Sequence, residues 1–307
     1  MPVPELSPAV QDALNNGRPV VALESTIISH GLPRPGNLAA ARSFEALLTE
    51  TGVTPATIAV IDGVPKVGLV PADLERIAMD ESVIKVSSRD LGLAMATGRT
   101  AGTTVAATSV LAALAGIWVF ATGGLGGVHR GFAGMMDESA DLTVLSRTPV
   151  TVVSAGVKSI LDIPATLERL ETLGVAVAGY RTNRFPAFYL TDSGEDLDWR
   201  VDSPAEIAAA MAARDELGET SALLIANPLP PERQLDPELH AKVLADALAA
   251  AESAGIRGKA VTPYLLEQMQ RATGGASVAV NLDVARGNIA LAGQIATAWS
   301  ACRSQTR

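Results

Sequence analysis

The stretch that decides the fold runs from residue 117 to residue 142 and reads IWVFATGGLGGVHRGFAGMMDESADL. Its first five residues are apolar and predict a buried strand. Four glycines within the next residues let the backbone turn sharply and approach a ligand closely. Ionisable side chains then follow: His129, Arg130, Asp137, Glu138 and Asp141. This order predicts a ligand site after the strand, and the alternative is a mobile surface loop with solvated charges.

Short apolar segments recur along the chain and predict further strands, with helical patterns between several of them. Such alternation predicts an α/β fold, three-layer α/β/α, with a largely parallel or mixed central sheet. From about Pro237 the pattern is almost entirely helical, which predicts a helical C-terminal third. The expected strands are 20–23, 57–61, 83–86, 117–121, 151–153, 175–178 and 223–226. The expected helices are 37–49, 103–114, 164–173 and 204–216, with one more that begins after Ser7.

Composition limits the classes of function. The chain has 307 residues, a 48% apolar fraction and a net charge of −9, and no linker divides it, so we expect one domain over residues 1–307. A clustered basic face is needed to bind nucleic acid, and this acidic composition argues against one. We expect no membrane segment and no secretory signal. The single cysteine, Cys302, favours the reducing cytoplasm, and a small polar molecule is the expected ligand.

Polar side chains follow several of the predicted strands. Glu24 follows the first strand, Thr122 the fourth, Lys158 the fifth and Asn227 the last. In open α/β sheets, ligands bind at the carboxyl ends of the strands, so we expect these side chains to meet at one edge. For Glu24 alone, a strand-end carboxylate that caps a neighbouring helix is an equally good interpretation.

Lys85 stands inside the otherwise apolar segment 83–86. Burying an ammonium without a partner is costly, so the lysine faces either an anionic ligand or solvent at an edge strand. Downstream, glycines and threonines at 98–105 open the next predicted helix. Free amides at a helix N-terminus attract phosphate, although threonine there is often only an N-cap.

Several blocks of the sequence resemble the pseudouridine-5′-phosphate glycosidase family, which includes indigoidine-cluster A-type proteins and C-ribosylating biosynthetic members. The blocks are VALESTIISHGLPRPGN, KVSSRDLGLAMATGRTAGTTVAAT, FATGGLGGVHRG with DESADL, SAGVKSILDI, FPAFYL, ANPLP and GKAVTPYLL with TGGASVAVN. They occur in this order over nearly the whole chain.

The resemblance implies reversible cleavage of the C–C glycosidic bond of pseudouridine 5′-phosphate to uracil and ribose 5-phosphate. Carbon is a poor leaving atom, and a lysine Schiff base supplies the electron sink that such a cleavage needs. The family's nucleophilic lysine corresponds to Lys158, and its general acid corresponds to Glu24, for which a pKa raised towards neutrality is expected.

The resemblance also implies ligands and assembly. Asp137 corresponds to the ligand of a divalent metal, Mn²⁺ or Mg²⁺, with water completing the shell. We expect His129 to orient the substrate rather than bind the metal, and Asn281 to contact the pyrimidine edge. The family is commonly trimeric, so a homo-oligomer is expected. The remaining predicted substrate contacts are Lys85, Thr104, Val105, Ser139, Ala140 and Asp141.

Three residues depart from the family pattern. Glu138 replaces a common isoleucine, Arg184 lies in a segment where carboxylates are usual, and Asp283 lies close to Asn281. They predict an altered aglycone side and motivate a second hypothesis, a biosynthetic C-ribosyltransferase that joins ribose 5-phosphate to an aromatic acceptor. A non-catalytic phosphosugar-binding protein is the third.

Overall fold

The computed structural model describes residues 4–131, 134, 136–256 and 261–305. Within these residues the strands are β1 Glu5–Leu6, β2 Val20–Leu23, β3 Thr54–Ile61, β4 Val64–Val67, β5 Ile84–Val86, β6 Ala101–Thr103, β7 Val119–Ala121, β8 Thr151–Ser154, β9 Ala176–Tyr180, β10 Arg200–Val201 and β11 Leu223–Ala226. They join into one sheet whose main path has the order β1-β4-β3-β2-β7-β8-β11-β9-β10. Most neighbours are parallel, but β4 and β6 run antiparallel to β3, so the sheet is mixed.

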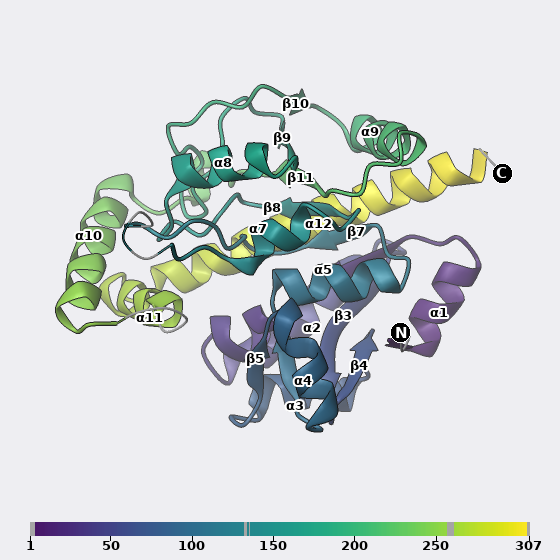
Figure 1. The fold of residues 1–307 in the computed structure, drawn as a ribbon, viewed down its shortest axis with the longest axis horizontal. Helices are drawn as coiled ribbons and strands as arrows, with labels where there is room; N and C mark the ends of the chain where they lie inside the picture. Colours follow the sequence, from purple (N-terminus) through teal and green to yellow (C-terminus); the bar gives the residue numbers. More distant parts are fainter. Residues whose placement is uncertain (1–3, 132–133, 135, 257–260, 306–307) are drawn as a thin grey trace.

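Helices cover both faces of this sheet (Figure 1). The α-helices are α1 Pro8–Asn15, α2 Gly36–Thr49, α3 Pro71–Met79, α4 Leu91–Ala96, α5 Val105–Leu114, α7 Ala140–Leu145, α8 Ile163–Thr172, α9 Pro204–Glu216, α10 Pro237–Ser253, α11 Val261–Ala272 and α12 Ala276–Gln305. This arrangement confirms the predicted three-layer α/β fold and its helical C-terminal third. Among the described residues, no helix is both long and apolar enough to cross a membrane.

Alternate residues of the central strands point to opposite faces, as strand geometry requires. In β2, Ala22 packs in the core cluster with α5 and α8, whereas Leu23 packs in the cluster with α2, α9 and α12. In β7, Phe120 packs in the first of these clusters and Val119 packs in the second. Each central strand therefore reads as a continuous apolar run, because both of its faces are buried.

The long helix α12 crosses the molecule along one face of the sheet and contacts β2, β7 and β8. Helices α10 and α11 lie at one end of the molecule, and α1 and the C-terminal end of α12 lie at the other (Figure 1). The carboxyl ends of β2, β7 and β8 are thus framed by elements that come from distant parts of the sequence.

The sequence prediction was wrong at the start of the helix expected at residue 103. Ala101–Thr103 forms strand β6, Thr104 is the N-cap, and α5 begins at Val105. The Thr104 hydroxyl accepts a hydrogen bond from the Ala107 amide, as an N-cap does. Strand β6 is too short for a period-2 pattern, and its pairing with β3 and β5 is a tertiary feature.

Candidate active site

The candidate site lies at the carboxyl ends of three neighbouring parallel strands. Glu24 follows β2, Thr122 follows β7, and Lys158 lies four residues after β8. Because β2 pairs with β7 and β7 with β8, these strand ends are adjacent. The structure therefore brings Glu24 and Lys158 together, and both line the same two cavities.

Backbone hydrogen bonds join the glycine-rich turn to the segment after β8. The Leu125 amide donates to the Gly156 carbonyl at 3.0 Å, and the Lys158 amide donates to the Leu125 carbonyl at 3.1 Å. Gly156 has a φ of +77°, and a Cβ there would lie 2.5 Å from the Pro186 carbonyl oxygen, so only glycine fits. These bonds fix the backbone that carries Lys158 against the backbone after β7.

Glu24 is 8% exposed, and the Thr122 hydroxyl donates a hydrogen bond to its Oε1. Burial is the largest influence on this carboxyl and raises its pKa, whereas Lys158, Thr122 and Lys85 act in the opposite direction. The predicted upward shift is confirmed. A protonated carboxyl whose Oε1 accepts from Thr122 would carry its proton on Oε2.

Lys85 lies on an edge strand and also in the wall of the candidate site. Strand β5 pairs with β6 and is off the main path of the sheet, so Lys85 does lie on an edge strand. Its side chain nevertheless lines both cavities that contain Glu24 and Lys158. Lys85 is exposed as a whole residue, but partial burial and then Lys158 lower its pKa, while Glu24 and Asp141 oppose the shift.

The larger of these cavities has a volume of about 410 Å³. It collects every predicted site residue except Asn281, which lies in the smaller cavity. The predicted residues that line the larger cavity are Glu24, Lys85, Thr104, Val105, His129, Asp137, Ser139, Ala140, Asp141 and Lys158. Within the described part of the stretch after β7, residues 123, 124, 126, 129 and 137–141 therefore belong to cavity walls, whereas Met136 is exposed.

Asp141 ties the glycine-rich turn to α5. It is 5% exposed, and its two carboxylate oxygens accept hydrogen bonds from the Ala106 amide at 2.9 Å and the Gly126 amide at 2.8 Å. Ala107 donates to Thr104, so two amides of the first turn of α5 are already engaged. The Val105 amide is then the one in this turn that remains for the expected phosphate contact.

The loop between Gly126 and Ser139 holds His129 and Asp137 close to each other. The His129 amide donates to the Asp137 carbonyl at 3.0 Å, and both side chains are half-buried in the cavity wall. Burial lowers the pKa of His129, Asp137 opposes this, and Lys158 adds to it, so the neutral ring is favoured. No cluster of three or more potential metal-ligating side chains occurs among the described residues. A dication at Asp137 would have to keep most of its water, as hard ions do.

A smaller inner cavity of about 60 Å³ shares Glu24, Lys85 and Lys158 with the larger one. Asn281 of α12 and Phe188 line it, and Phe188 has a positive φ of 62°, which is a strained conformation for an aromatic residue. A Cβ on Gly124 would lie 2.5 Å from the Phe188 ring, so this glycine allows the ring to cover the turn. An outer cavity of about 220 Å³ shares Asn281 with the inner one.

The three departures from the family pattern occupy different places in the structure. Glu138 does line the larger cavity, but its carboxylate forms a bidentate ion pair with Arg169 of α8. Arg184 pairs with Asp192 and Asp196. Asp283 lies 3.6 Å from Arg286, and neither Arg184 nor Asp283 lines any of the three cavities. The charges of Arg184 and Asp283 are used in ion pairs away from these cavities, and the altered aglycone side stays a prediction.

Sequence reasoning missed several residues of the site. Arg89 lines the larger cavity, and the charged block directly after strand 83–86 was a signal for it. The Thr26 hydroxyl is buried without a partner among the described residues and lines both cavities. Asn288 of α12 donates to the carbonyls of Thr122 and Gly123 at 2.7 and 3.2 Å. A helical asparagine gives no such signal in the sequence.

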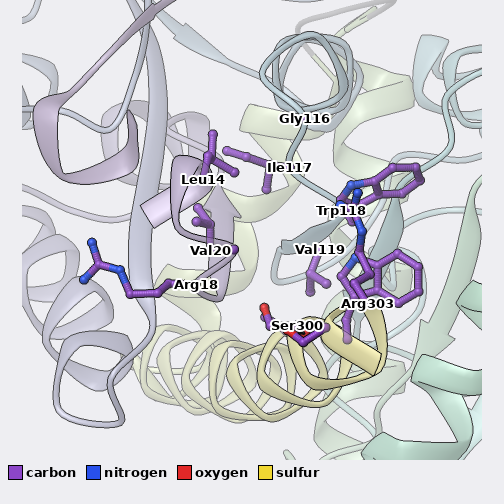
Figure 2. A pocket seen from close by; sticks show the side chains of 13 residues that line it. Leu14, Arg18, Val20, Gly116, Ile117, Trp118, Val119, Ser300 and Arg303 are labelled. Carbon is purple, nitrogen blue, oxygen red and sulfur yellow. Dashed lines mark hydrogen bonds between the residues drawn. The ribbon is translucent and has the colours of Figure 1, made fainter. Parts of the chain in front are cut away.

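A separate cavity of about 100 Å³ lies at the amino ends of β2 and β7, beside the C-terminal end of α12. Figure 2 shows Trp118 and Arg303 close together on one wall, with Leu14 and Val20 on the other. The Arg303 guanidinium lies 5.7 Å from the centroid of the Trp118 ring. None of the predicted site residues lines this cavity, so it is distinct from the candidate site.

We expect Gly126→Ala to unfold at lower denaturant and to lose activity. A Cβ there would lie 2.2 Å from Ser139 Oγ and 2.8 Å from Asp141 Oδ2, and crowding of this kind costs about 1–3 kcal/mol. Urea unfolding measures the effect. Gly92→Ala is the matched control, since no atom lies within 4 Å of its Cβ position and it stands in α4. Equal stability of the two variants would contradict the prediction.

Comparison with known proteins agrees with these features. The model of the family described as indigoidine synthase A like protein matches residues 9–298. A pseudouridine-5′-phosphate glycosidase of Frankia alni is 63% identical, over 96% of this chain and 82% of that protein. Its namesake from Saccharopolyspora erythraea is 59% identical over 97% and 98% of the two chains.

Solved structures give the same result. The prealnumycin C-glycosynthase AlnA, in complex with ribulose 5-phosphate, is similar with a TM-score of 0.92 at 37% identity, over 99% of both chains. An indigoidine synthase A-like protein from Thermotoga maritima has a TM-score of 0.88 at 34% identity, over 97% of both. This chain therefore belongs to the family of indigoidine synthase A-like proteins.

Proposed function

We propose that this protein cleaves and forms the C–C glycosidic bond of pseudouridine 5′-phosphate, giving uracil and ribose 5-phosphate with uptake of water. The observation that carries the proposal is the position of Glu24 and Lys158, which line both the larger and the inner cavity. With a sugar phosphate in the larger cavity and a base in the inner cavity, the carbon that joins them would lie where the two cavities meet, beside Glu24 and Lys158. The names of the relatives that are 59–63% identical support the same activity.

Glu24 acts as the general acid in this proposal. Its raised pKa keeps a proton available, and Thr122 holds Oε1 so that Oε2 is free to donate. The proton passes to the ring oxygen of the ribose while the C1′–O4′ bond breaks. Ring opening gives the sugar carbon that the lysine attacks.

Lys158 acts as the nucleophile. Its nitrogen bonds to C1′, and its lone pair then forms the C=N bond as the bond between C1′ and C5 of the base breaks. C5 takes up a proton, and hydrolysis of the imine releases ribose 5-phosphate and restores the amine. Lys85 lines the same cavity as Lys158.

The larger cavity suits the sugar phosphate. Arg89 and Lys85 supply positive charge there, and the Val105 amide at the start of α5 supplies a hydrogen-bond donor. Asp137 is the residue that would hold a Mn²⁺ or Mg²⁺ ion, and His129 would orient the substrate beside it. When bound, the cation would supply positive charge to the oxygens of the open-chain sugar.

Two measurements test the function. Incubation of the protein with pseudouridine 5′-phosphate and Mn²⁺ should release uracil, detected by chromatography. Reduction with borohydride in the presence of ribose 5-phosphate should leave a stable adduct on Lys158, located by mass spectrometry. No uracil release at high protein concentration, with metal content verified, would refute the activity. An adduct would exclude a pure binding protein.

We expect Asp137→Ala to raise the Mn²⁺ concentration needed for half-maximal activity by about 10- to 100-fold, because a lost carboxylate ligand is replaced by water. Titration of Mn²⁺ by electron paramagnetic resonance measures the affinity independently of turnover. Asp192→Ala is the control, since that carboxylate pairs with Arg184 outside the site. Unchanged Mn²⁺ affinity in Asp137→Ala would exclude Asp137 as the ligand.

A biosynthetic C-ribosyltransferase is the second candidate, favoured by the similarity to the C-glycosynthase AlnA. Two of the three residues that suggested it, Arg184 and Asp283, lie outside the three cavities of the site. Competition between uracil and a bulky aromatic acceptor for ribose 5-phosphate distinguishes the two. If only the aromatic acceptor gave a product in this competition, the second function would be established.

We also propose that the protein works in the cytoplasm as a homo-oligomer, a trimer by resemblance to its family. The support for the location is compositional, since the chain has one cysteine, Cys302. Light scattering coupled to size-exclusion chromatography measures the mass. A mass near 31.6 kDa would indicate a monomer and contradict the assembly.

A further inference from the structure

His30 stands at the junction of the inner and outer cavities. It belongs to η1 (Ile27–Gly31), a π-helical turn that follows β2, and such turns occur frequently at functional sites. His30 lines both cavities together with Asn281, and the inner cavity also contains Glu24 and Lys158. The imidazole is therefore placed beside the reacting centre on the side where a base would lie.

The two contacts of Ser29 Oγ are the basis on which a tautomer is assigned to His30. The Ser29 hydroxyl donates its single hydrogen to the Ser25 carbonyl at 3.0 Å, the i−4 bond that serine makes in helical turns. Ser29 Oγ also lies 2.7 Å from His30 Nδ1, so the ring nitrogen is assigned as the donor in this pair. His30 is exposed as a whole residue, but partial burial of its ring, then Lys85 and Arg34, lower its pKa and favour the neutral ring. Nε2 is then an acceptor.

Asn281 presents a second acceptor to the same cavity. Its side chain is 9% exposed, and Oδ1 is buried with no hydrogen-bond partner among the described residues. Oδ1 lies 3.5 Å from the position that a Cβ on Gly123 would take. A buried acceptor without a donor costs stability, so this oxygen indicates a ligand that brings one.

The walls between these acceptors are apolar. Ile27, Phe188 and Leu266 line the inner cavity, and the Phe188 ring lies over Gly124. An aromatic wall beside a backbone turn without side chains suits a flat ring. The cavity therefore combines a place for a planar heterocycle with two acceptors, one on α12 and one on η1.

We propose that His30 recognises the N1–H group of the base, while Asn281, which the family resemblance places at the pyrimidine edge, meets its N3–H side. This inference rests on the proposed function, since it concerns a uracil ring joined to the sugar through C5. The N3–H group is flanked by two carbonyls, which suits an amide that accepts and donates. On the side towards C5, the N1–H group is followed by the C6–H group, which offers no acceptor, so a side chain that only accepts suits N1–H. A uridine joined to its sugar through N1 has no N1–H, so His30 selects C-nucleosides.

Binding in the Lys158→Ala protein tests the inference without turnover. Calorimetry compares pseudouridine 5′-phosphate with its N1-methyl and N3-methyl derivatives. We expect the N1-methyl compound to bind about 10- to 100-fold more weakly, because a polar site rejects a ligand that lacks the matching group. Adding His30→Ala should bring that ratio close to one and leave the rejection of the N3-methyl compound unchanged. Gln270→Ala, which alters the outer cavity alone, should change neither ratio.

A measurement on the unsubstituted protein complements the variants. Nitrogen-15 spectra of histidine-labelled protein at neutral pH should show His30 protonated at Nδ1 and not at Nε2. A proton on Nε2, or an N1-methyl ratio that His30→Ala leaves unchanged, would overturn the inference. If His30→Ala brought the affinity ratios of both the N1-methyl and the N3-methyl compounds close to one, the inference would also be overturned, since that result indicates a change of pocket shape. Failure of the parent compound to bind would instead count against the proposed function.

Discussion

Lys158→Ala should abolish both turnover and the borohydride-trapped adduct. We expect kcat to fall by about 10⁴-fold or more, as when the nucleophile of a covalent mechanism is removed. Alanine fits the site because Lys158 is half-buried at a cavity, and its backbone bond to Leu125 does not need the side chain. Stopped assays for uracil and mass spectrometry after reduction measure the two losses.

The chain offers a matched control for this variant. Lys242 is exposed on α10, and its amine pairs with Asp246 in the same helix. Lys242→Ala should keep full activity and the full yield of adduct. Turnover by Lys158→Ala above about 1% of the unsubstituted rate would show that the imine is formed elsewhere or not at all.

Glu24→Gln should lower kcat by about 10²- to 10⁴-fold, the usual contribution of a general acid. Glutamine keeps the shape of the side chain and an oxygen that can accept from Thr122, but it has no proton to donate. In the unsubstituted protein, kcat should fall as pH rises through the raised pKa of Glu24. The variant should lose this limb of the pH profile, which steady-state kinetics over pH would measure.

Glu24→Gln should lose activity but gain stability relative to the parent protein as pH rises. The pKa of Glu24 in the folded protein is raised above its ordinary value of 4.5. The stability that this shift contributes is fully present below the unfolded pKa and is lost as pH rises through the folded pKa. Glutamine does not ionise, so the variant should gain stability relative to the parent as pH rises. Thermal unfolding at several pH values measures the gain.

Glu45→Gln separates the acid role from simple burial. Glu45 is half-buried, accepts a hydrogen bond of 2.6 Å from the Thr57 hydroxyl, and has a pKa raised by burial, yet it lies outside the site. Its variant should show the same direction of stability change with no loss of kcat. Equal activity of the Glu24 and Glu45 variants would remove Glu24 from the mechanism.

Much of the architecture could be predicted from the sequence, because burial on both faces of a parallel strand leaves a continuous apolar run. Strands β2 and β11 have the predicted bounds, and α9 begins and ends where its pattern indicated. Strand β3 begins at Thr54 rather than Thr57. The three residues before Thr57 are Thr54, Pro55 and Ala56, which form no apolar run, and pairing with β2 recruits them into the sheet.

The sequence by itself predicted the central strands and the strand ends that carry Glu24 and Lys158, because local patterns of burial and polarity encode both. It did not predict the short strands β1, β4, β6 and β10, which depend on pairing with neighbouring strands. Only the tertiary structure decided which charges reach the cavity. Arg184 and Asp283 are as charged as Lys85, but they meet ion-pair partners on the surface, whereas Lys85 extends from an edge strand into the site. The physical reason is that the surroundings of a side chain come from segments distant in sequence, as with His30 of η1 and Asn281 of α12.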